Sequence, residues 1–440
     1  MNKRQRLLFN TYFNTEDLGQ LFFYIGLFLL PSAFTIGALF LLISLVKSFY
    51  DDRNFLVQIF LNRWNLIFLI SAFMLILSSL INFFNPESIN NLSGESYLEF
   101  IGLLNWIPLI FTFIGFQKYL SSTINRKKVS QVLIAGSIPV IFSVIAQVIF
   151  SWQTKMETLY GLIVWYQKKL IADLGHTGVT GLFSNPNYLG AWLVIILPFC
   201  ISLIFIEKKI SIRWLVSSFI LIFVCISIVL TTSRAAWICL FLSIPLVNGR
   251  KINKLFLRIF GGIISFAFLF YLTISTELSN FLKGLIPVGI WKEFTTANIS
   301  PRIRIWDTAV KLISENPLFG SGASSFSSIF HKETGLWQGH AHNLPLELMV
   351  SYGVLASLLI LLPISLILYK SFVKSYRDSS IEVRSIILDR AWVSSLLLLF
   401  FMHLVDIQYL DGRISILGWL LLAGAKNIID EKKFPDSSHN

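Results

Sequence analysis

The sequence predicts an all-α fold, a polytopic transmembrane helical bundle of about 11–12 spans with one long extracytoplasmic loop that contains amphipathic helices. Hydrophobic residues make up 55% of the 440 positions and charged residues only 14%. Several apolar runs exceed the roughly 20 residues that cross the hydrocarbon core of a bilayer, where only internally hydrogen-bonded helices survive as single segments. Because a soluble domain cannot bury this much apolar surface, soluble classes are excluded.

About eleven apolar runs are long enough to be read as spans. They lie near residues 21–46, 64–84, 98–120, 130–152, 188–206, 213–232, 235–247, 255–275, 344–369, 391–410 and 413–429. The basic start "MNKRQRLL" is followed by a polar interval and by an apolar run too long for a cleavable signal peptide, so the first span is expected to anchor itself. Cys200, Cys225 and Cys239 fall inside spans, which favours buried thiols over disulfides.

The net charge of +12 is concentrated in short loops between spans, a pattern that indicates cytoplasmic loops rather than a nucleic-acid partner. The opposite face then receives 85–97, 153–187, 231–234, 276–343 and 407–412. Eleven spans with a cytoplasmic C-terminus would put the basic N-terminus outside. A span before residue 64 has therefore been missed or merged, and Pro31 is the expected place of the break.

We expect one transmembrane domain over 1–440, with 276–343 inserted as a periplasmic loop, because loops of this length tend to be functional. Within the loop, "PRIRIWDTAVKLISENPLFGSG" predicts an amphipathic helix that begins near Pro301 and ends by Pro317 and Gly320. Its apolar face is expected to contain Ile305, Ala309 and Leu312. "FGSG" could also cradle a phosphate through its backbone amides, although ending the helix is sufficient reason for it.

Three arginines are predicted on the outer face. Arg234, in "TTSRAAW", lies between two apolar stretches and is either a headgroup anchor or a functional cation. Arg302 and Arg304 are two residues apart and therefore on different faces of the loop helix, so one can face a cavity while the other meets water. Guanidinium groups match phosphate oxygens with forked donors, which makes all three candidates for diphosphate binding.

The stretch "GHAHNLPLELMV" puts His340 and His342 at the entrance to an apolar run. The alternatives are a general base, a metal ligand or an interfacial residue. No metal is predicted, because the outer face offers no D-x-D and no Glu-rich cluster to complete a site. An imidazole is suited to accepting a proton from a sugar hydroxyl at neutral pH, and His342, nearer the helix start, is the candidate catalytic base.

Weaker candidates surround His342. His340 and Asn343 are its sequence neighbours. In "SNPNYLGAW", Asn185 is expected to cap a helix, and Asn187 follows it. His403 and Asp406 share a helix face at i and i+3, which is either a functional signal or a structural pair.

The order of "NPNYLG", "TTSRAAW", "RIRIWDTAVKLISENPLFGSG" and "HAHNLPLELMVSYG" over roughly residues 180–410 resembles the O-antigen ligase and polymerase superfamily. The family's motif of His, then Asn, Ser or Gln, nine residues and Gly falls on His342, Asn343 and Gly353. Ala356 stands where the motif continues with Gly, Thr or Tyr, a change that affects packing more than chemistry. The family's arginine after Thr or Ser matches Arg234, although Ile238 replaces the usual leucine, and its loop arginine matches Arg302 better than Arg304.

The resemblance implies a cell inner (plasma) membrane glycosyltransferase of the helical C-type (GT-C) class. Its expected donor is a polyprenyl-diphosphate-linked glycan, used on the periplasmic face without a metal or cofactor and with inversion, and its acceptor is a glycan, lipid or protein hydroxyl. Ligation to a lipopolysaccharide core, polymerisation of repeat units and protein glycosylation all remain open. Because some relatives are labelled inorganic-carbon transporters, a transporter remains the alternative, and a non-catalytic assembly partner is a third. A transporter should show internal repeats and mid-membrane charges, and the sequence has no repeat and few such charges.

Overall fold

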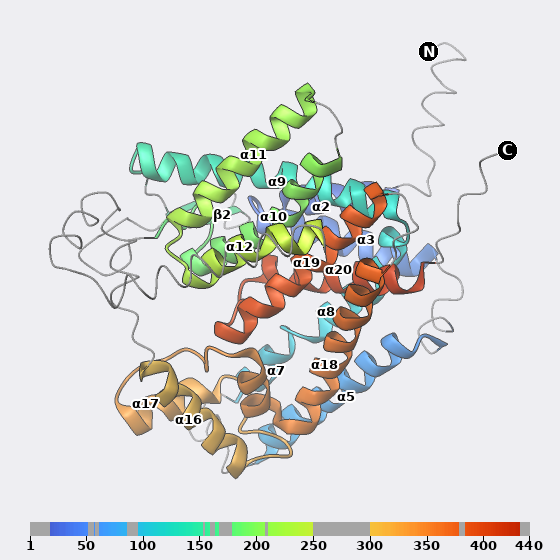
Figure 1. Cartoon of the computed structure of the whole chain (residues 1–440). Coiled ribbons are helices and arrows are strands. Elements are labelled where there is room, and N and C mark those ends of the chain that lie inside the picture. Colours follow the sequence, from blue (N-terminus) through green and yellow to red (C-terminus); the bar gives the residue numbers. More distant parts are fainter. Residues whose placement is uncertain are drawn as a thin grey trace.

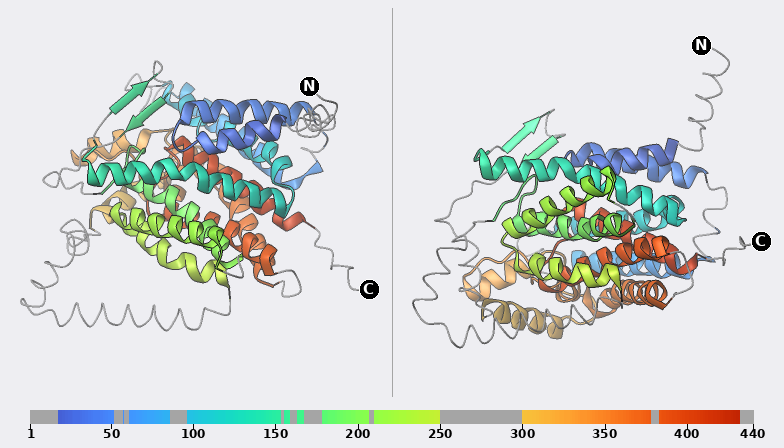
Figure 2. Two further views of the ribbon diagram at one scale, coloured as in Figure 1. Left: turned by 90° about the horizontal axis from the view of Figure 1, so that it is seen from above. Right: turned by 45° about the horizontal axis from the view of Figure 1, so that its top comes forward.

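The computed structural model describes residues 18–51, 57, 61–85, 96–152, 155–158, 163–166, 178–206, 210–249, 300–377 and 383–431. Within these ranges nine helices are long and apolar enough to cross a membrane, and two shorter apolar helices accompany them. The predicted all-α membrane bundle is therefore confirmed. A small antiparallel hairpin of β1 (Lys155–Thr158) and β2 (Ile163–Tyr166) is an addition that the sequence did not predict (Figure 2). The predicted span near 255–275 lies outside the described residues.

The helix bounds follow the predicted runs closely in most of the chain (Figure 1). The first half contains α2 (Leu18–Leu29), α3 (Phe34–Asp51), α5 (Arg63–Phe84), α7 (Leu98–Leu103), α8 (Ile107–Phe116) and α9 (Thr123–Ile149). The second half contains α10 (Pro186–Ile206), α11 (Ile212–Leu230), α12 (Arg234–Asn248), α16 (Ser300–Glu315), α17 (Ser325–Thr334), α18 (Leu344–Arg377), α19 (Val383–Val405) and α20 (Gly412–Asp430).

The predicted single span at 21–46 is wrong, because it is two helices. Pro31 lies in the turn between α2 and α3, where its ring and missing N–H end the first helix, and the two helices lie side by side (Figure 2). The extra helix also determines where α2 begins. Ser44 Oγ donates to Gly19 O at 2.8 Å and Tyr119 Oη donates to Ser44 O at 3.0 Å, so the start of α2 lies beside the basic loop after α8.

The helix ends fall into two groups. We call one the basic end; it is defined by Lys118, Arg126, Lys127, Lys128, Arg213, Lys374 and Arg390. There Arg126 of α9 bonds Asp389 of α19 at 3.0 Å, and Lys374 of α18 donates to Ile429 O of α20 at 2.9 Å. The opposite end, the loop end, contains the turns before α10, α12, α18 and α20 together with α16 and α17 (Figure 1). By the positive-inside rule the basic end is expected to face the cytoplasm.

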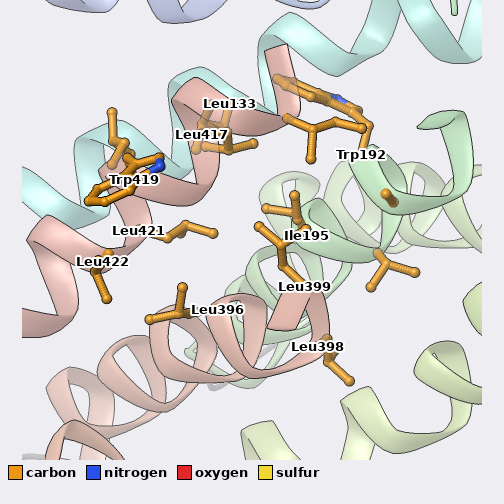
Figure 3. Close-up of a cluster of buried hydrophobic side chains, with 14 of the residues drawn as sticks. Leu133, Trp192, Ile195, Leu396, Leu398, Leu399, Leu417, Trp419, Leu421 and Leu422 are labelled. Carbon is orange, nitrogen blue, oxygen red and sulfur yellow. The ribbon is translucent and has the colours of Figure 1, made fainter. Parts of the chain in front are cut away.

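The centre of the bundle is formed by α10, α19 and α20, whose leucines and tryptophans meet in one buried cluster with α9 (Figure 3). In an 18-residue stretch of α10, 78% of the residues are buried, compared with 17% in α11. Helix α11 therefore lies at the periphery. Lipid tails are as apolar as leucine, and helix association therefore depends on close packing and on hydrogen bonds between helices. Two examples are Trp192 Nε1 to Ser137 Oγ at 2.9 Å and Ser395 Oγ to Ile195 O at 2.7 Å.

The predicted amphipathic loop helix is confirmed as α16. Ile305, Ala309 and Leu312 are 2%, 0% and 4% exposed, as the predicted apolar face requires. They pack with the phenylalanines of α17 and with Val350 of α18, so the loop forms its own small core against the first turns of α18. The sequence did not predict α17.

Gly353 breaks α18 where this loop docks. Its φ of 82° and ψ of 169° lie in a region that is essentially restricted to glycine. A Cβ there would lie 2.7 Å from Phe319 N, and Val354 N donates to Pro317 O at 2.8 Å. From the other side, Ser78 of α5 donates to Phe319 O at 2.6 Å. The segment between α16 and α17 is therefore fixed in the break of α18.

Candidate functional site

The site is built on the turn that leads into α18. Asn343 caps the helix, because its Oδ1 accepts the Leu346 N–H at 3.0 Å and its Nδ2 donates to Leu404 O at the end of α19 at 2.8 Å. One turn into α18, buried Glu347 accepts the Ala341 N–H through Oε2 at 2.8 Å. These bonds hold the turn on both sides of His342, whose φ of 51° is in the left-handed region where histidine is rare but tolerated.

Asp406 lies directly after the last residue of α19 and faces this turn. Its Oδ1 is 2.8 Å from His342 Nδ1 and also accepts the Ile407 N–H at 2.8 Å. Its Oδ2 accepts from Asn187 Nδ2 at 2.9 Å. Burial raises the pKa of Asp406, but the hydrogen bond and charge of His342 and the Ile407 N–H act in the opposite direction, and the pKa is lowered overall. The carboxylate is therefore ionised at neutral pH and holds one ring nitrogen of His342.

The other ring nitrogen of His342 points to Gln338. Nε2 lies 3.2 Å from Gln338 Oε1, and the side chain of His342 is 25% exposed. With oxygen atoms on both sides, the ring is satisfied as an imidazolium that donates from both nitrogens. With the Gln338 amide turned by 180°, the neutral tautomer with Nδ1–H is satisfied instead, and Nε2 accepts. The two amide orientations thus match the two protonation states that a general base passes through.

His340 is held neutral beside this pair. Burial lowers its pKa to about 4, the charge of His342 lowers it further, and Asp406 acts in the opposite direction. His340 Nδ1 accepts the His342 N–H at 3.2 Å, so its proton resides on Nε2, which faces Asp406 Oδ1 at 3.9 Å.

His340, His342 and Asp406 also have the composition of a metal-ligand set, since one potential ligand atom of each lies within 4.8 Å of the others. A metal at His340 Nε2 would need the proton on Nδ1, where it would meet the N–H of His342. As arranged, this donor set fits a hydrogen-bonded cluster better than a metal centre.

Of the weaker candidates, His403 alone does not belong to the turn. Asn185 caps α10 as predicted, with its Oδ1 accepting the Asn187 N–H at 2.8 Å, and this cap directs the Asn187 side chain to Asp406. His403 is not the partner of Asp406. Its Nδ1 lies 3.4 Å from Gln408 N, and its side chain lines a cavity of about 70 Å³ with Trp106 and Tyr409. The shared helix face fails because α19 ends at Val405, before Asp406.

The arginines lie at the loop end but outside this hydrogen-bonded cluster. Arg234 is the first residue of α12, and its side chain is exposed. On α16, Arg302 is half-buried and Arg304 is exposed, so the two residues do face different surroundings. Among the residues that the structure describes, none of the three donates a hydrogen bond to His342 or Asp406.

The "FGSG" segment does not offer a phosphate cradle in this structure. Ser321 N donates to Val350 O at 2.7 Å and Gly322 N donates to Ser351 O at 3.2 Å, so these amides are used in docking the loop onto α18. Sequence reasoning missed Gln338 and Glu347 as parts of the turn. A glutamate four residues after a helix cap was the available signal for Glu347, and Gln338 had none.

No curated protein matches the chain. A protein family described as O-antigen ligase matches residues 219–361. The matched segment includes the three arginines and the turn with His340, His342 and Asn343, whereas Asn187, His403 and Asp406 lie outside it. Residues 219–361 of this multi-pass membrane chain are therefore similar to the O-antigen ligase family.

Proposed function

We propose that the protein is a membrane glycosyltransferase that transfers or polymerises glycan from a polyprenyl-diphosphate-linked donor, without a metal and with inversion at the anomeric carbon. The observation that carries the proposal is the pairing of His342 Nδ1 with an ionised Asp406 at 2.8 Å, inside a chain with an O-antigen ligase domain. The positive-inside rule assigns the basic end to the cytoplasm, and this supports a periplasmic location for the site at the opposite end.

The proposed base is His342. Asp406 fixes its tautomer with Nδ1–H and stabilises the imidazolium that forms, so that Nε2 accepts the proton. The acceptor hydroxyl takes the place of Gln338 at Nε2 and gives up its proton there. Its oxygen forms the bond to the anomeric carbon while the bond from that carbon to the diphosphate oxygen breaks. A single displacement of this kind inverts the anomeric centre.

The leaving diphosphate gains negative charge as that bond breaks, and fixed cations stabilise it. Arg234 and Arg302 are the proposed cations, with Arg304 as a secondary contact. The half-buried position of Arg302 and its place on a helix docked to the start of α18 support this role. A forked contact predicts that Arg302→Lys loses much of the rate although the charge is kept.

The test is glycan transfer in liposomes that contain purified protein and a polyprenyl-diphosphate-linked glycan. His342→Ala should abolish transfer, while His331→Ala should not, because His331 is an exposed histidine on α17 of the same loop. Full activity of the His342 variant would remove the base from the proposal. Solute flux into sealed vesicles without any lipid-linked donor would instead support the transporter alternative.

Metal independence is tested separately in the same assay. Turnover in EDTA should equal turnover in buffer, because no step in the proposal uses a metal. Loss of activity in EDTA that Mg²⁺ or Mn²⁺ restores would contradict this part of the proposal while leaving His342 as a possible base.

A further inference from the structure

The basic end contains a groove that the proposed transferase reaction does not use. It encloses about 400 Å³ between α9, the end of α10 and the first half of α11. We call it the α9–α11 groove and define it by Lys127, Gln131, Ile138, Arg213, Ser217 and Ile220. In Figure 1, α11 runs at an angle to α9 instead of along it. Only 17% of an 18-residue stretch of α11 is buried, so most of this helix is not packed against the bundle.

The groove is polar at its mouth and apolar along its length. Lys127, in the first turns of α9, and Arg213, in the first turn of α11, are exposed at the mouth. One turn further in lie Gln131 and Ser217, and beyond them the lining is aliphatic. No acidic side chain lines the groove among the described residues. This order of groups is complementary to a phospholipid. The two cations match its phosphate, the neutral polar side chains match its ester carbonyls, and the apolar wall matches its acyl chain.

The length of the groove also fits one lipid leaflet. Lys127 and Ile138 are separated along α9 by about 16 Å at the helical rise of about 1.5 Å per residue. Half of a hydrocarbon core of about 30 Å is about 15 Å. A headgroup at the basic mouth would therefore place its acyl chain along the wall and end it near the midplane.

We propose that the α9–α11 groove binds one anionic phospholipid of the cytoplasmic leaflet. Lys127 and Arg213 contact its phosphate and its charged headgroup, and an acyl chain fills the apolar length between α9 and α11. Basic pockets between helices on the cytoplasmic side favour anionic headgroups for the same electrostatic reason. Bound in this way, the lipid would join the peripheral α11 to the bundle at the end where the protein itself leaves a gap.

The test is a lipid titration of the purified full-length protein in detergent, followed by native mass spectrometry. Phosphatidylglycerol and phosphatidylcholine with identical acyl chains are compared, so that only the headgroup differs. The wild type should bind one phosphatidylglycerol more tightly than phosphatidylcholine. The double variant Lys127→Gln, Arg213→Gln should weaken phosphatidylglycerol binding on the order of 30-fold, because each basic residue near an anionic lipid contributes about fivefold.

Two further variants make the result specific to the groove. The control is Lys128→Gln with Arg63→Gln, since Arg63 is the first residue of α5 and lies with Lys370 over the ring of Trp64. It removes the same charge outside the groove and should keep the preference for phosphatidylglycerol. Ala135→Trp fills the apolar wall and should reduce the binding of both lipids. Equal binding of the two lipids by the wild type, equal losses in the two double variants, or an unaffected tryptophan variant would each overturn the proposal. None of these outcomes depends on glycan transfer.

Discussion

Replacing Asp406 by asparagine tests whether the carboxylate acts on His342. Asparagine keeps the shape of the side chain, and its Oδ1 still accepts from His342 Nδ1 and from the Ile407 N–H. Its Nδ2 would face Asn187 Nδ2, but a 180° turn of the Asn187 amide restores that bond. The substitution therefore removes the negative charge and leaves the hydrogen-bond pattern intact.

The size of the effect follows from the geometry. The bond between His342 and Asp406 is 2.8 Å long and the carboxylate side chain is only 13% exposed, so solvent screens it little. A hydrogen bond to a charged group of this kind is worth about 1.5–3 kcal/mol. The neutral bond that asparagine makes in its place is worth about 0.5–1.5 kcal/mol, so the substitution loses about 1–1.5 kcal/mol. Since the proposed imidazolium forms in the transition state, kcat should fall roughly 5- to 13-fold. The KM for the lipid-linked donor should stay near its original value, because Asp406 contacts the base and not the donor.

The assay is initial-rate glycan transfer in liposomes, with the thermal unfolding midpoint measured on the same preparations. Asp307→Asn is the matched control, since Asp307 is an exposed aspartate on α16, and it should have no effect on kcat. Asp406→Ala should be slower than Asp406→Asn, because it leaves Asn187 and His342 without an acceptor. A folded Asp406→Asn protein with unchanged kcat would refute the reasoning.

Four other changes probe the surroundings of the turn. Asn187→Ala removes one hydrogen-bond donor to the Asp406 carboxylate and should lower kcat by about fivefold to tenfold, because the net hydrogen bond is worth about 1–1.5 kcal/mol, while the KM for the lipid-linked glycan stays the same. An unchanged kcat would mean that this hydrogen bond is dispensable. Glu347→Gln keeps an oxygen for the Ala341 N–H and should retain most activity, whereas Glu347→Leu should not, and equal rates would contradict a positioning role. Gly353→Ala should destabilise the fold by at least about 1–3 kcal/mol, read as a lower unfolding midpoint, because alanine at that φ and ψ is strained and meets the docked loop. The pKa of His340 is 6.5 in the unfolded chain and about 4 in the folded protein, so between these values the unfolded chain binds more protons and the folded state loses stability as pH falls, by roughly 2 kcal/mol near pH 5. His340→Asn should therefore reduce the fall of the unfolding midpoint at acidic pH, and an unchanged pH dependence of the midpoint would contradict this prediction.

Much of the fold could be predicted because apolar runs and basic loops are local signals. The runs at 64–84, 188–206 and 413–429 became α5, α10 and α20 with bounds that differ by one or two residues. The run at 21–46 could not be divided by hydropathy alone, since both helices of the hairpin are apolar. Pro31 was the one local signal for the turn, and it indicated the correct place.

The site was less predictable because its contacts are not local. His342 and Asn343 could be singled out from their boundary position and their motif. The partner of Asp406 could not be predicted, because the i and i+3 spacing indicated His403. Since α19 ends at Val405, the carboxylate of Asp406 instead faces His342, which is 64 positions away in the sequence. Gln338 lies in a polar interval without periodicity, and no pattern distinguishes it from its neighbours.

The residues of this cluster are far apart in the sequence, and this affects the biogenesis of the protein. Asn187 and His342 are synthesised before Asp406, which emerges only after α19, so an unfinished chain holds the imidazole without its carboxylate. Membrane helices that enter the bilayer in order of synthesis would therefore complete the reactive centre among their last steps. A chain arrested before α19 would lack the carboxylate on which the proposed transfer depends.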